Sequence, residues 1–151
     1  MGYQIKFTGL VINRQPTISV LFEVKAFKIS KIVSFLVDSG SKFSAITEKE
    51  ATIMGIDCSS LPDAKMEAVG FGGSFRNRNI NREVILTFKS NQDEHRIKLG
   101  CFQVNCIPLN LTREEREKLI RLIPNVLGMD ILRTFRTCFD AGQVELTLLE
   151  K

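Results

Sequence analysis

The chain has 151 residues, of which 44% are hydrophobic and 25% are charged, and its formal net charge is +4. This length suits one domain with a core of its own, and the composition excludes the disordered and collagen-like classes. The mean hydropathy is +0.02, and every apolar run is far shorter than the roughly 18 residues that a membrane helix needs. We therefore expect one soluble domain over residues 1–151, with no membrane segment.

The first residues and the cysteines indicate the cellular compartment in which the protein is expected. The first residues lack a charged leader followed by an apolar block, so secretion is not indicated. The four cysteines lie in otherwise apolar segments, which is typical of reduced thiols in a core. They are Cys58, Cys101, Cys106 and Cys138. We expect a cytoplasmic protein without a metal site, because no cysteines have zinc-knuckle spacing with a histidine nearby.

The first third of the chain has the pattern of β-strands. Residues 17–25 place apolar side chains at every second position, which predicts a strand with one buried face. Residues 32–37 are almost all apolar, which predicts a strand buried on both faces. This second strand ends at Asp38. Residues 1–15 are compatible with either an additional strand or a segment that is removed.

Two capping boxes predict helices. Thr47 is followed three residues later by Glu50, and Thr112 is followed in the same way by Glu115. In this arrangement the hydroxyl and the carboxylate each satisfy a backbone N–H group of the first helical turn. A third short helix is predicted over residues 129–134. The sequence thus predicts two or three short helices in a chain that is otherwise rich in strand patterns.

The middle and the end of the chain are again strand-like. Residues 66–69 lead into a glycine-rich tip, Gly70-Phe71-Gly72-Gly73, and residues 84–88 alternate apolar and other side chains, which predicts a glycine-tipped hairpin. Further strands are predicted over 95–99 and 102–107. Residues 135–148 are interpreted as a second hairpin, with Asp140-Ala141-Gly142 as its turn.

The only histidine limits the chemistry that is available. His95 follows a polar stretch, which favours a solvated position in a turn between two strands over a catalytic base. One histidine also excludes a metal site built on a histidine pair. If the protein is an enzyme, carboxylates are therefore its expected acid and base. Arg76, Arg78 and Arg82 are interpreted as the solvated, charged edge of a hairpin.

Two segments about ninety residues apart carry the most specific signal. In the first, an apolar strand delivers Asp38 into the small-residue loop Ser39-Gly40-Ser41, which alone is compatible with an ordinary turn. In the second, Val126-Leu127-Gly128 precedes a predicted helix. Together the two segments resemble the retropepsin family of single-domain aspartic proteases. The resemblance covers most of the chain, from about residue 17 to residue 148.

The resemblance implies a mostly β, closed-barrel acid-protease fold. The predicted helix at residues 112–123 would be an insertion before the second segment. The glycine-rich tip, with Gly70, Phe71, Gly72 and Gly73, takes the place of the family's flap over the substrate. Val126, Leu127 and Gly128 would support the loop that carries the acid. Because the tip has no tyrosine, a phenylalanine would supply any aromatic wall.

The resemblance also implies a mechanism and a partner. Hydrolysis by carboxylates needs two acids sharing one proton, and one chain offers one such aspartate, so a homodimer would pair Asp38 with its copy. Ser39 would bond across the interface, Gly40 would let the backbone approach the acids, and Ser41 would complete the loop. The expected substrate is an extended peptide or protein, hydrolysed by an activated water without a metal or cofactor.

Two other functions are compatible with the sequence. The first is a retropepsin-like dimer that no longer cleaves and serves as a peptide-binding or assembly module. The second is a basic β domain that binds nucleic acid through Arg76, Arg78, Arg82 and nearby lysines. We do not expect nucleic acid as a partner, because the sequence lacks the stacked aromatic residues that single-strand binders use.

Overall fold

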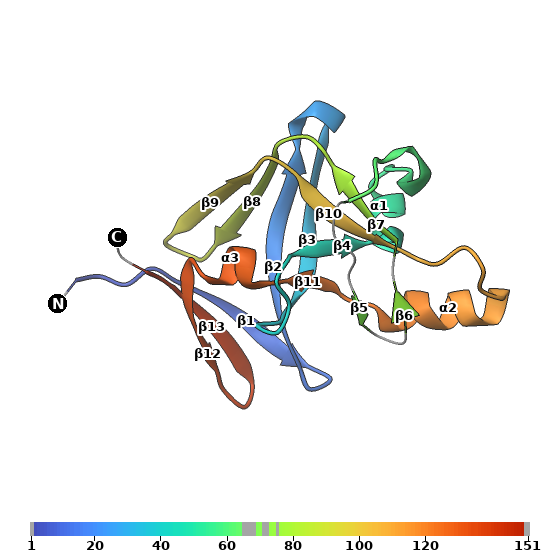
Figure 1. Cartoon of the computed structure of the whole chain (residues 1–151). Coiled ribbons are helices and arrows are strands. Elements are labelled where there is room, and N and C mark those ends of the chain that lie inside the picture. Colours follow the sequence, from blue (N-terminus) through green and yellow to red (C-terminus); the bar gives the residue numbers. More distant parts are fainter. Residues whose placement is uncertain (1, 65–68, 71–72, 75, 150–151) are drawn as a thin grey trace.

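The computed structural model describes residues 2–64, 69–70, 73–74 and 76–149, and it is mostly β (Figure 1). The strands are β1 (Lys6–Ile12), β2 (Gln15–Val24), β3 (Ile29–Val37), β4 (Ala45–Thr47), β5 (Val69–Gly70), β6 (Gly73–Ser74), β7 (Arg76–Ile80), β8 (Val84–Lys89), β9 (Glu94–Leu99), β10 (Phe102–Cys106), β11 (Asn125–Leu127), β12 (Phe135–Phe139) and β13 (Gln143–Leu148). The helices are α1 (Glu48–Ile53), α2 (Arg113–Leu122) and α3 (Met129–Leu132), with 3-10 turns η1 (Lys25–Phe27) and η2 (Cys58–Ser60). Within the described residues, no helix is long and apolar enough to cross a membrane.

One large sheet dominates the molecule, and it is not closed. Its strands follow the order β12-β13-β1-β2-β3-β11-β4-β10-β7, with β8 paired to β2 and β9 paired to β8. The predicted closed barrel is therefore wrong in this respect. The reason lies in β2, which pairs with β1 near its start and with β8 near its end, so that the sheet branches there instead of joining its two outer strands.

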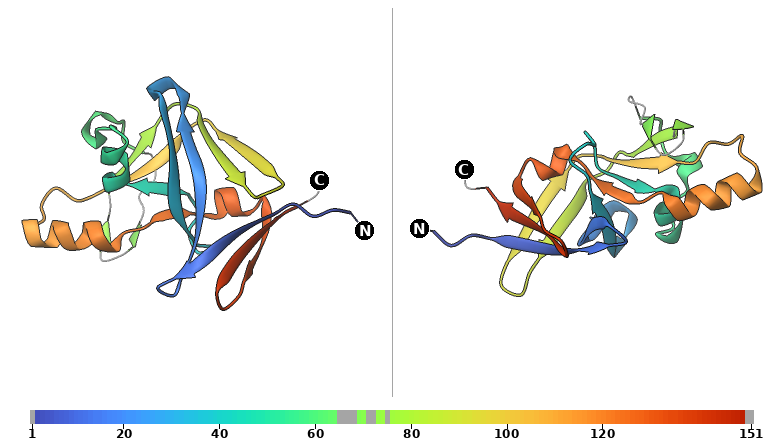
Figure 2. Two further views of the ribbon diagram at one scale, coloured as in Figure 1. Left: turned by 180° about the vertical axis from the view of Figure 1, so that it is seen from behind. Right: turned by 90° about the horizontal axis from the view of Figure 1, so that it is seen from below.

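The two ends of the chain lie on the same side of the molecule, and α2 lies on the opposite side (Figures 1 and 2). The strand β1 pairs with β13 and β2, so the N-terminal segment forms the additional strand that the sequence left open. Arg116 of α2 donates to the Glu48 carboxylate at 2.6 Å, which links α2 to α1. The helix α2 has no fully buried residue.

Alternating side chains of β2 and β3 build the centre of the core. Ile18, Val20 and Phe22 of β2 are buried, and Val33 and Phe35 face them from β3. The prediction that residues 32–37 are buried on both faces is wrong, since the Ile32 side chain is 68% exposed. Burial alternates along β3, with Ser30, Ile32 and Ser34 exposed, so the strand has one buried face.

The predicted threonine N-caps are confirmed, but the reciprocal bond of a capping box is not made at Thr47, whose N–H donates to Asn125 Oδ1 at 2.9 Å. The Thr47 hydroxyl accepts from the Glu50 N–H at 3.1 Å, and the Thr112 hydroxyl accepts from the Glu115 N–H at 3.2 Å. After α1 the chain turns at Gly55, whose φ of 85° is a left-handed conformation that other residues adopt only with strain. The short helix α3 lies within the predicted range 129–134. Local sequence signals therefore determine where each helix begins.

His95 does not lie in a solvated turn. It belongs to β9, opposite Phe88 of β8, and its ring packs edge-on against Phe135 with 6.1 Å between the ring centroids. The turn itself is closer to Ser90, whose hydroxyl accepts from the Asp93 N–H at 2.9 Å. Partial burial among aromatic rings lowers the pKa of His95 below its ordinary value of 6.5.

This shift predicts a pH dependence of stability. The unfolded chain binds a proton at His95 more readily than the folded chain, so the free energy of unfolding should fall as the pH drops below about 6.5. The variant His95→Gln cannot titrate there and should lose less stability between pH 7 and pH 5, as measured by urea unfolding. Parallel stability curves for the two proteins would refute this assignment.

Two of the three predicted surface arginines are not solvated. Arg76 donates to the Ile107 carbonyl at 3.1 and 3.2 Å, and Arg78 donates to the Leu61 carbonyl at 2.6 Å. Both side chains also lie near carboxylates, Arg76 near Glu48 and Arg78 near Asp63. Only Arg82 fits the interpretation as an exposed edge. The guanidinium groups thus satisfy carbonyls that β-pairing leaves free.

The four cysteines form one buried pair and one exposed pair. Cys58 and Cys106 are buried as predicted, whereas Cys101 and Cys138 are exposed, and all four are free thiols. Cys101 lies between β9 and β10, and Cys138 lies on β12, which is at one end of the sheet. An apolar sequence neighbourhood therefore does not ensure burial at a loop or on an outer strand.

Candidate active site

The two sequence motifs, around Asp38 and before Gly128, meet in the centre of the sheet. The strand β3 runs parallel to β11, with Phe35 opposite Asn125, Leu36 opposite Val126 and Val37 opposite Leu127. On its other side β11 pairs with β4 through Val126 and Ala45. The segment before Asp38, the segment after it and the segment before Gly128 thus form three neighbouring strands.

Asp38 lies directly after β3 and is held at both its backbone and its side chain. Its N–H donates to the Leu127 carbonyl at 3.0 Å, which extends the β3–β11 pairing by one bond. Its carboxylate oxygen Oδ1 accepts from the Gly40 N–H at 2.9 Å. The residue is only partly buried. Asp38 therefore presents a carboxylate at the surface on a backbone that the core fixes.

Ser39, Gly40 and Ser41, which form the loop after Asp38, differ in their contacts and in their exposure. The Ser41 N–H donates to the Asp38 carbonyl at 3.2 Å, and the Ser41 hydroxyl donates to the Phe43 carbonyl at 2.9 Å, so Ser41 closes the loop on itself. A Cβ atom at Gly40 would lie 3.2 Å from Asp38 Oδ1, so a side chain there would crowd the carboxylate. Ser39 is exposed at the tip of the loop.

Gly128 supports this loop through close backbone contact. A Cβ atom at this position would lie 2.7 Å from the Ser41 carbonyl oxygen and 2.8 Å from the Phe43 carbonyl group. The next two residues, Met129 and Asp130, donate backbone N–H groups to the Ser41 and Lys42 carbonyls at 2.7 and 3.1 Å. Val126 and Leu127 are buried beneath. The structure thus brings the second motif against the loop of the first.

A buried hydrogen-bond network between Ser44 and Asp130 fixes the same junction. The Asp130 carboxylate accepts from the Ser44 N–H at 3.0 and 3.1 Å and from the Ser44 hydroxyl at 2.7 Å. The Ser44 hydroxyl in turn accepts from the Gly128 N–H at 2.9 Å. The sequence motifs include both residues, but nothing in their spacing reveals the bond, because they are 86 positions apart.

Removing the Asp130 carboxylate should therefore loosen the site. Asp130→Ala leaves the buried Ser44 N–H and hydroxyl without their acceptor, which we expect to cost about 2 kcal/mol in the free energy of unfolding. Asp130→Asn keeps one acceptor oxygen and should cost less. Urea unfolding of the two variants measures the difference, and an Asp130→Ala midpoint equal to that of the wild type would refute the role given to this network.

The glycine-rich tip forms a hairpin, but the predicted second arm over residues 84–88 is wrong, because β8 pairs with β2 and β9. β5 and β6 pair antiparallel, with Val69 opposite Ser74 and Gly70 opposite Gly73. Phe71 and Gly72, the remaining predicted residues of the tip, lie outside the described residues. Before this hairpin in the chain, the Ala64 N–H donates to the Asn77 carbonyl at 2.8 Å and the Asn79 N–H donates to the Pro62 carbonyl at 2.9 Å, which joins residues 62–64 to β7. The strands β5 and β6 form a two-stranded sheet of their own.

Asp140 occupies a hairpin turn, as predicted. Its N–H donates to the Gln143 carbonyl at 2.9 Å between β12 and β13, and its carboxylate accepts from the Ala141 N–H. The residue is exposed. Asp140 therefore has neither the parallel strand pair nor the supporting glycine that surround Asp38.

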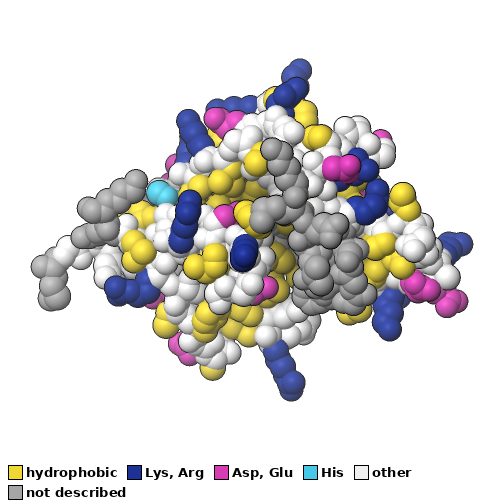
Figure 3. Space-filling view, viewed as in Figure 1, with side chains coloured by type: hydrophobic (Ala, Val, Ile, Leu, Met, Phe, Trp, Pro, Cys, Tyr) yellow, Lys and Arg dark blue, Asp and Glu magenta, His cyan; other side chains and the backbone are white. Residues whose placement is uncertain are grey.

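The basic side chains do not form one continuous patch on the face shown in Figure 3, where lysines and arginines are scattered among acidic and neutral groups. Arg76 and Arg78 are engaged with backbone carbonyls, which reduces their availability to a polyanion. The structure thus gives no support to the nucleic-acid interpretation on this face.

Comparisons with known proteins agree with this geometry. No protein-family model and no curated protein sequence matches the chain. Among solved structures, the chain is similar to a retropepsin-like aspartic protease from Rickettsia conorii, with 18% identity, a TM-score of 0.54, and coverage of 97% of this chain and 93% of that chain. It is also similar to the EIAV protease complexed with the inhibitor HBY-793, with 18% identity, a TM-score of 0.46, and coverage of 81% and 88%.

A third similar structure is the retroviral protease-like domain of Ddi1 from Leishmania major, with 18% identity, a TM-score of 0.40, and coverage of 83% of this chain and 82% of that chain. The likeness to the Rickettsia conorii protein spans nearly all of both chains. The chain therefore has the fold of the retropepsin-like aspartic proteases.

Proposed function

We propose that the protein is an aspartic endopeptidase that acts as a homodimer through a pair of Asp38 carboxylates. The observation that carries this proposal is the position of Asp38: its carboxylate is partly exposed, while its backbone N–H is bonded to Leu127 of the second motif. A carboxylate that catalyses proton transfer must be accessible and must also be fixed in direction. The Asp38 carboxylate is both accessible and fixed in direction.

The chemistry requires a second carboxylate. One acid, ionised, removes a proton from the attacking water, while the other, protonated, donates to the carbonyl oxygen of the substrate. Within one chain, Asp140 is the other aspartate followed closely by glycine, but it lies in an exposed hairpin turn. A twofold axis beside the Asp38 loop would bring two copies of Asp38 together and would place the exposed Ser39 at the interface.

An extended peptide is the substrate class that this arrangement favours. The strands β5 and β6 form a two-stranded hairpin of their own, and the backbone of such a hairpin can pair with the main chain of an extended peptide. We infer that this hairpin is the flap and that Gly70, Phe71, Gly72 and Gly73 contribute to peptide binding. Closure over the substrate would exclude bulk water from the Asp38 pair and leave the attacking water in place. The reaction as proposed needs no metal or organic cofactor.

The test is cleavage of a diverse peptide library by the purified protein between acidic and neutral pH, combined with sedimentation to determine its oligomeric state. We expect cleavage by a dimer. A folded dimer that binds peptides without cleaving any of them would contradict the proposal and indicate a binding module. A protein that cleaves as a monomer would contradict the pairing of Asp38.

A further inference from the structure

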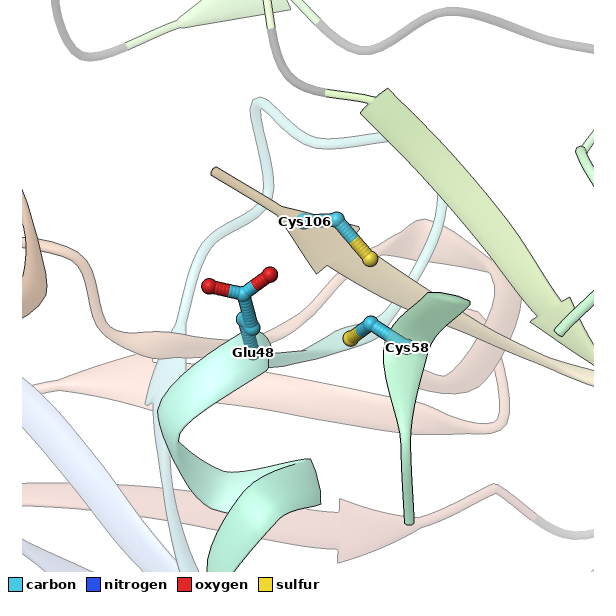
Figure 4. A group of neighbouring side chains, drawn as sticks. All are labelled: Glu48, Cys58 and Cys106. Carbon is cyan, nitrogen blue, oxygen red and sulfur yellow. The ribbon is translucent and has the colours of Figure 1, made fainter. Parts of the chain in front are cut away.

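A compact group of metal-binding side chains lies away from the Asp38 loop. Within the described residues, ligand atoms of Glu48, Cys58 and Cys106 all lie within 4.8 Å of one another. Figure 4 shows the three side chains converging from three elements: Glu48 begins α1, Cys58 begins η2 and Cys106 ends β10. None of the three takes part in the proposed peptidase site.

The group is buried. Cys106 is 0% exposed, Cys58 is 6% exposed, and the Glu48 side chain is 12% exposed. A carboxylate this far buried is uncommon and needs cations or hydrogen-bond donors beside it, because burial removes its charge from water. Such a combination is typical of a ligand set for a soft or borderline divalent cation, for which thiolate and carboxylate are suitable donors.

We propose that Glu48, Cys58 and Cys106 bind one zinc ion. Each cysteine would lose its thiol proton and form a Zn–S bond, so two protons would leave for each ion that binds, while Glu48 would contribute a carboxylate oxygen. Three protein ligands leave the fourth tetrahedral position to water. The site would tie α1, η2 and β10 together.

Neighbouring charges are compatible with this site. Two thiolates and one carboxylate exceed the charge of Zn²⁺ by one negative charge. Arg116 contacts Glu48 Oε2 at 2.6 Å, and Arg76 lies 4.0 Å from Glu48 Oε1, so two guanidinium groups are available to offset that excess. Arg76 is itself held by the Ile107 carbonyl, one residue after Cys106. These arginines would orient the carboxylate from outside the ligand set.

The two thiols also differ in acidity. A hydrogen bond between them lowers the pKa of Cys58, and the same bond together with burial raises the pKa of Cys106. Metal binding releases the protons of both thiols, because only thiolates are ligands.

The position of this group connects two parts of the chain. From Cys58 the chain continues to Leu61, whose carbonyl accepts from Arg78, and to Asp63, which pairs with Arg78 of β7. A cation held between η2 and β10 would fix this segment against β7. The expected role of the ion is therefore structural, and it does not depend on peptidase activity.

Cobalt spectroscopy tests the proposal on the reduced, metal-free full chain. Titration with Co²⁺ should give one equivalent per chain, with the thiolate charge-transfer absorption and the intense visible bands of tetrahedral Co²⁺, and one equivalent of Zn²⁺ should remove both. Cys58→Ser and Cys106→Ser should each weaken binding by about a hundredfold, and Glu48→Gln by about tenfold. The double variant Cys101→Ser with Cys138→Ser, which keeps the proposed ligands, should bind as the wild type does.

Circular dichroism shows which variants are folded before their titrations are compared. Absence of thiolate–cobalt absorption in the folded wild type at saturating Co²⁺ would overturn the proposal. So would absorption that survives in Cys58→Ser or disappears in the control double variant. If the cysteine variants do not fold, the wild-type stoichiometry and Glu48→Gln still decide the outcome, because both report on the ligand set directly.

Discussion

Asp38→Asn is expected to abolish peptide cleavage while leaving the protein folded and dimeric. Asparagine has nearly the same shape and retains an oxygen for the Gly40 N–H bond that now reaches Asp38 Oδ1. It cannot accept or donate the catalytic proton as a carboxylate pair does. We expect the rate of cleavage to fall by at least about a hundredfold, which is the low end for removal of a positioned acid or base.

The matched control is Asp140→Asn. Asp140 is the other aspartate followed closely by glycine, but its carboxylate lies in the exposed turn between β12 and β13. This variant should cleave at the wild-type rate. Initial rates on one peptide from the library, with sedimentation of all three proteins, measure the effect. Equal loss of activity in both variants, or full activity in a pure Asp38→Asn preparation, would contradict the role given to Asp38.

Gly128→Ala is expected to have the largest effect on stability at the site. The added Cβ would lie within 2.8 Å of backbone atoms of Ser41 and Phe43, and no side-chain rotation can relieve a contact between Cβ and backbone. Either β11 or the Asp38 loop must move. We expect a loss of about 3 kcal/mol in the free energy of unfolding, at the upper end of ordinary overpacking. Cleavage should decrease with it.

Gly142→Ala is the control for the effect of the methyl group itself, since a Cβ there meets no atom within 4 Å. Its stability should stay within about 0.5 kcal/mol of the wild type, as for an ordinary surface substitution. Urea unfolding of both variants measures the difference. A Gly128→Ala protein as stable as Gly142→Ala would show that the loop is free to move away, and the supporting role of Gly128 would be wrong.

Local signals in the sequence predicted most of the elements correctly. The Thr47 and Thr112 caps depend on bonds between residues three apart, so a short stretch of sequence contains all the partners. The alternating pattern of residues 17–25 likewise depends only on which side of β2 faces the core. Such features do not require knowledge of the rest of the fold.

Features that depend on distant partners were predicted less well. Ile32 lies in an apolar run but faces away from the core, because the outer side of β3 is uncovered there. His95 follows a polar stretch but packs on Phe135, which the sequence places forty residues away. The branching of the sheet at β2, which leaves it open, follows from how β1 and β8 share one edge of that strand.

In the candidate site, too, local motifs were predicted and contacts between distant residues were not. Asp38 and Gly128 were found from short motifs, and their proximity was implied by the resemblance to retropepsins. The bond from Asp130 to Ser44 and the group formed by Glu48, Cys58 and Cys106 join residues that are far apart in the chain. A search for closely spaced ligands does not find such a group, because α1, η2 and β10 come together only in the folded sheet.

Subunit mixing is the measurement that tests the central claim most directly. Wild type and Asp38→Asn are unfolded together, refolded at several ratios and assayed for cleavage, with an unrelated carrier protein as the control. If each site needs Asp38 from both chains, an equal mixture retains about one quarter of the activity of the same total amount of wild type, because random pairing leaves that share of wild-type dimers. Retention of half would show that each chain acts alone and would contradict the account.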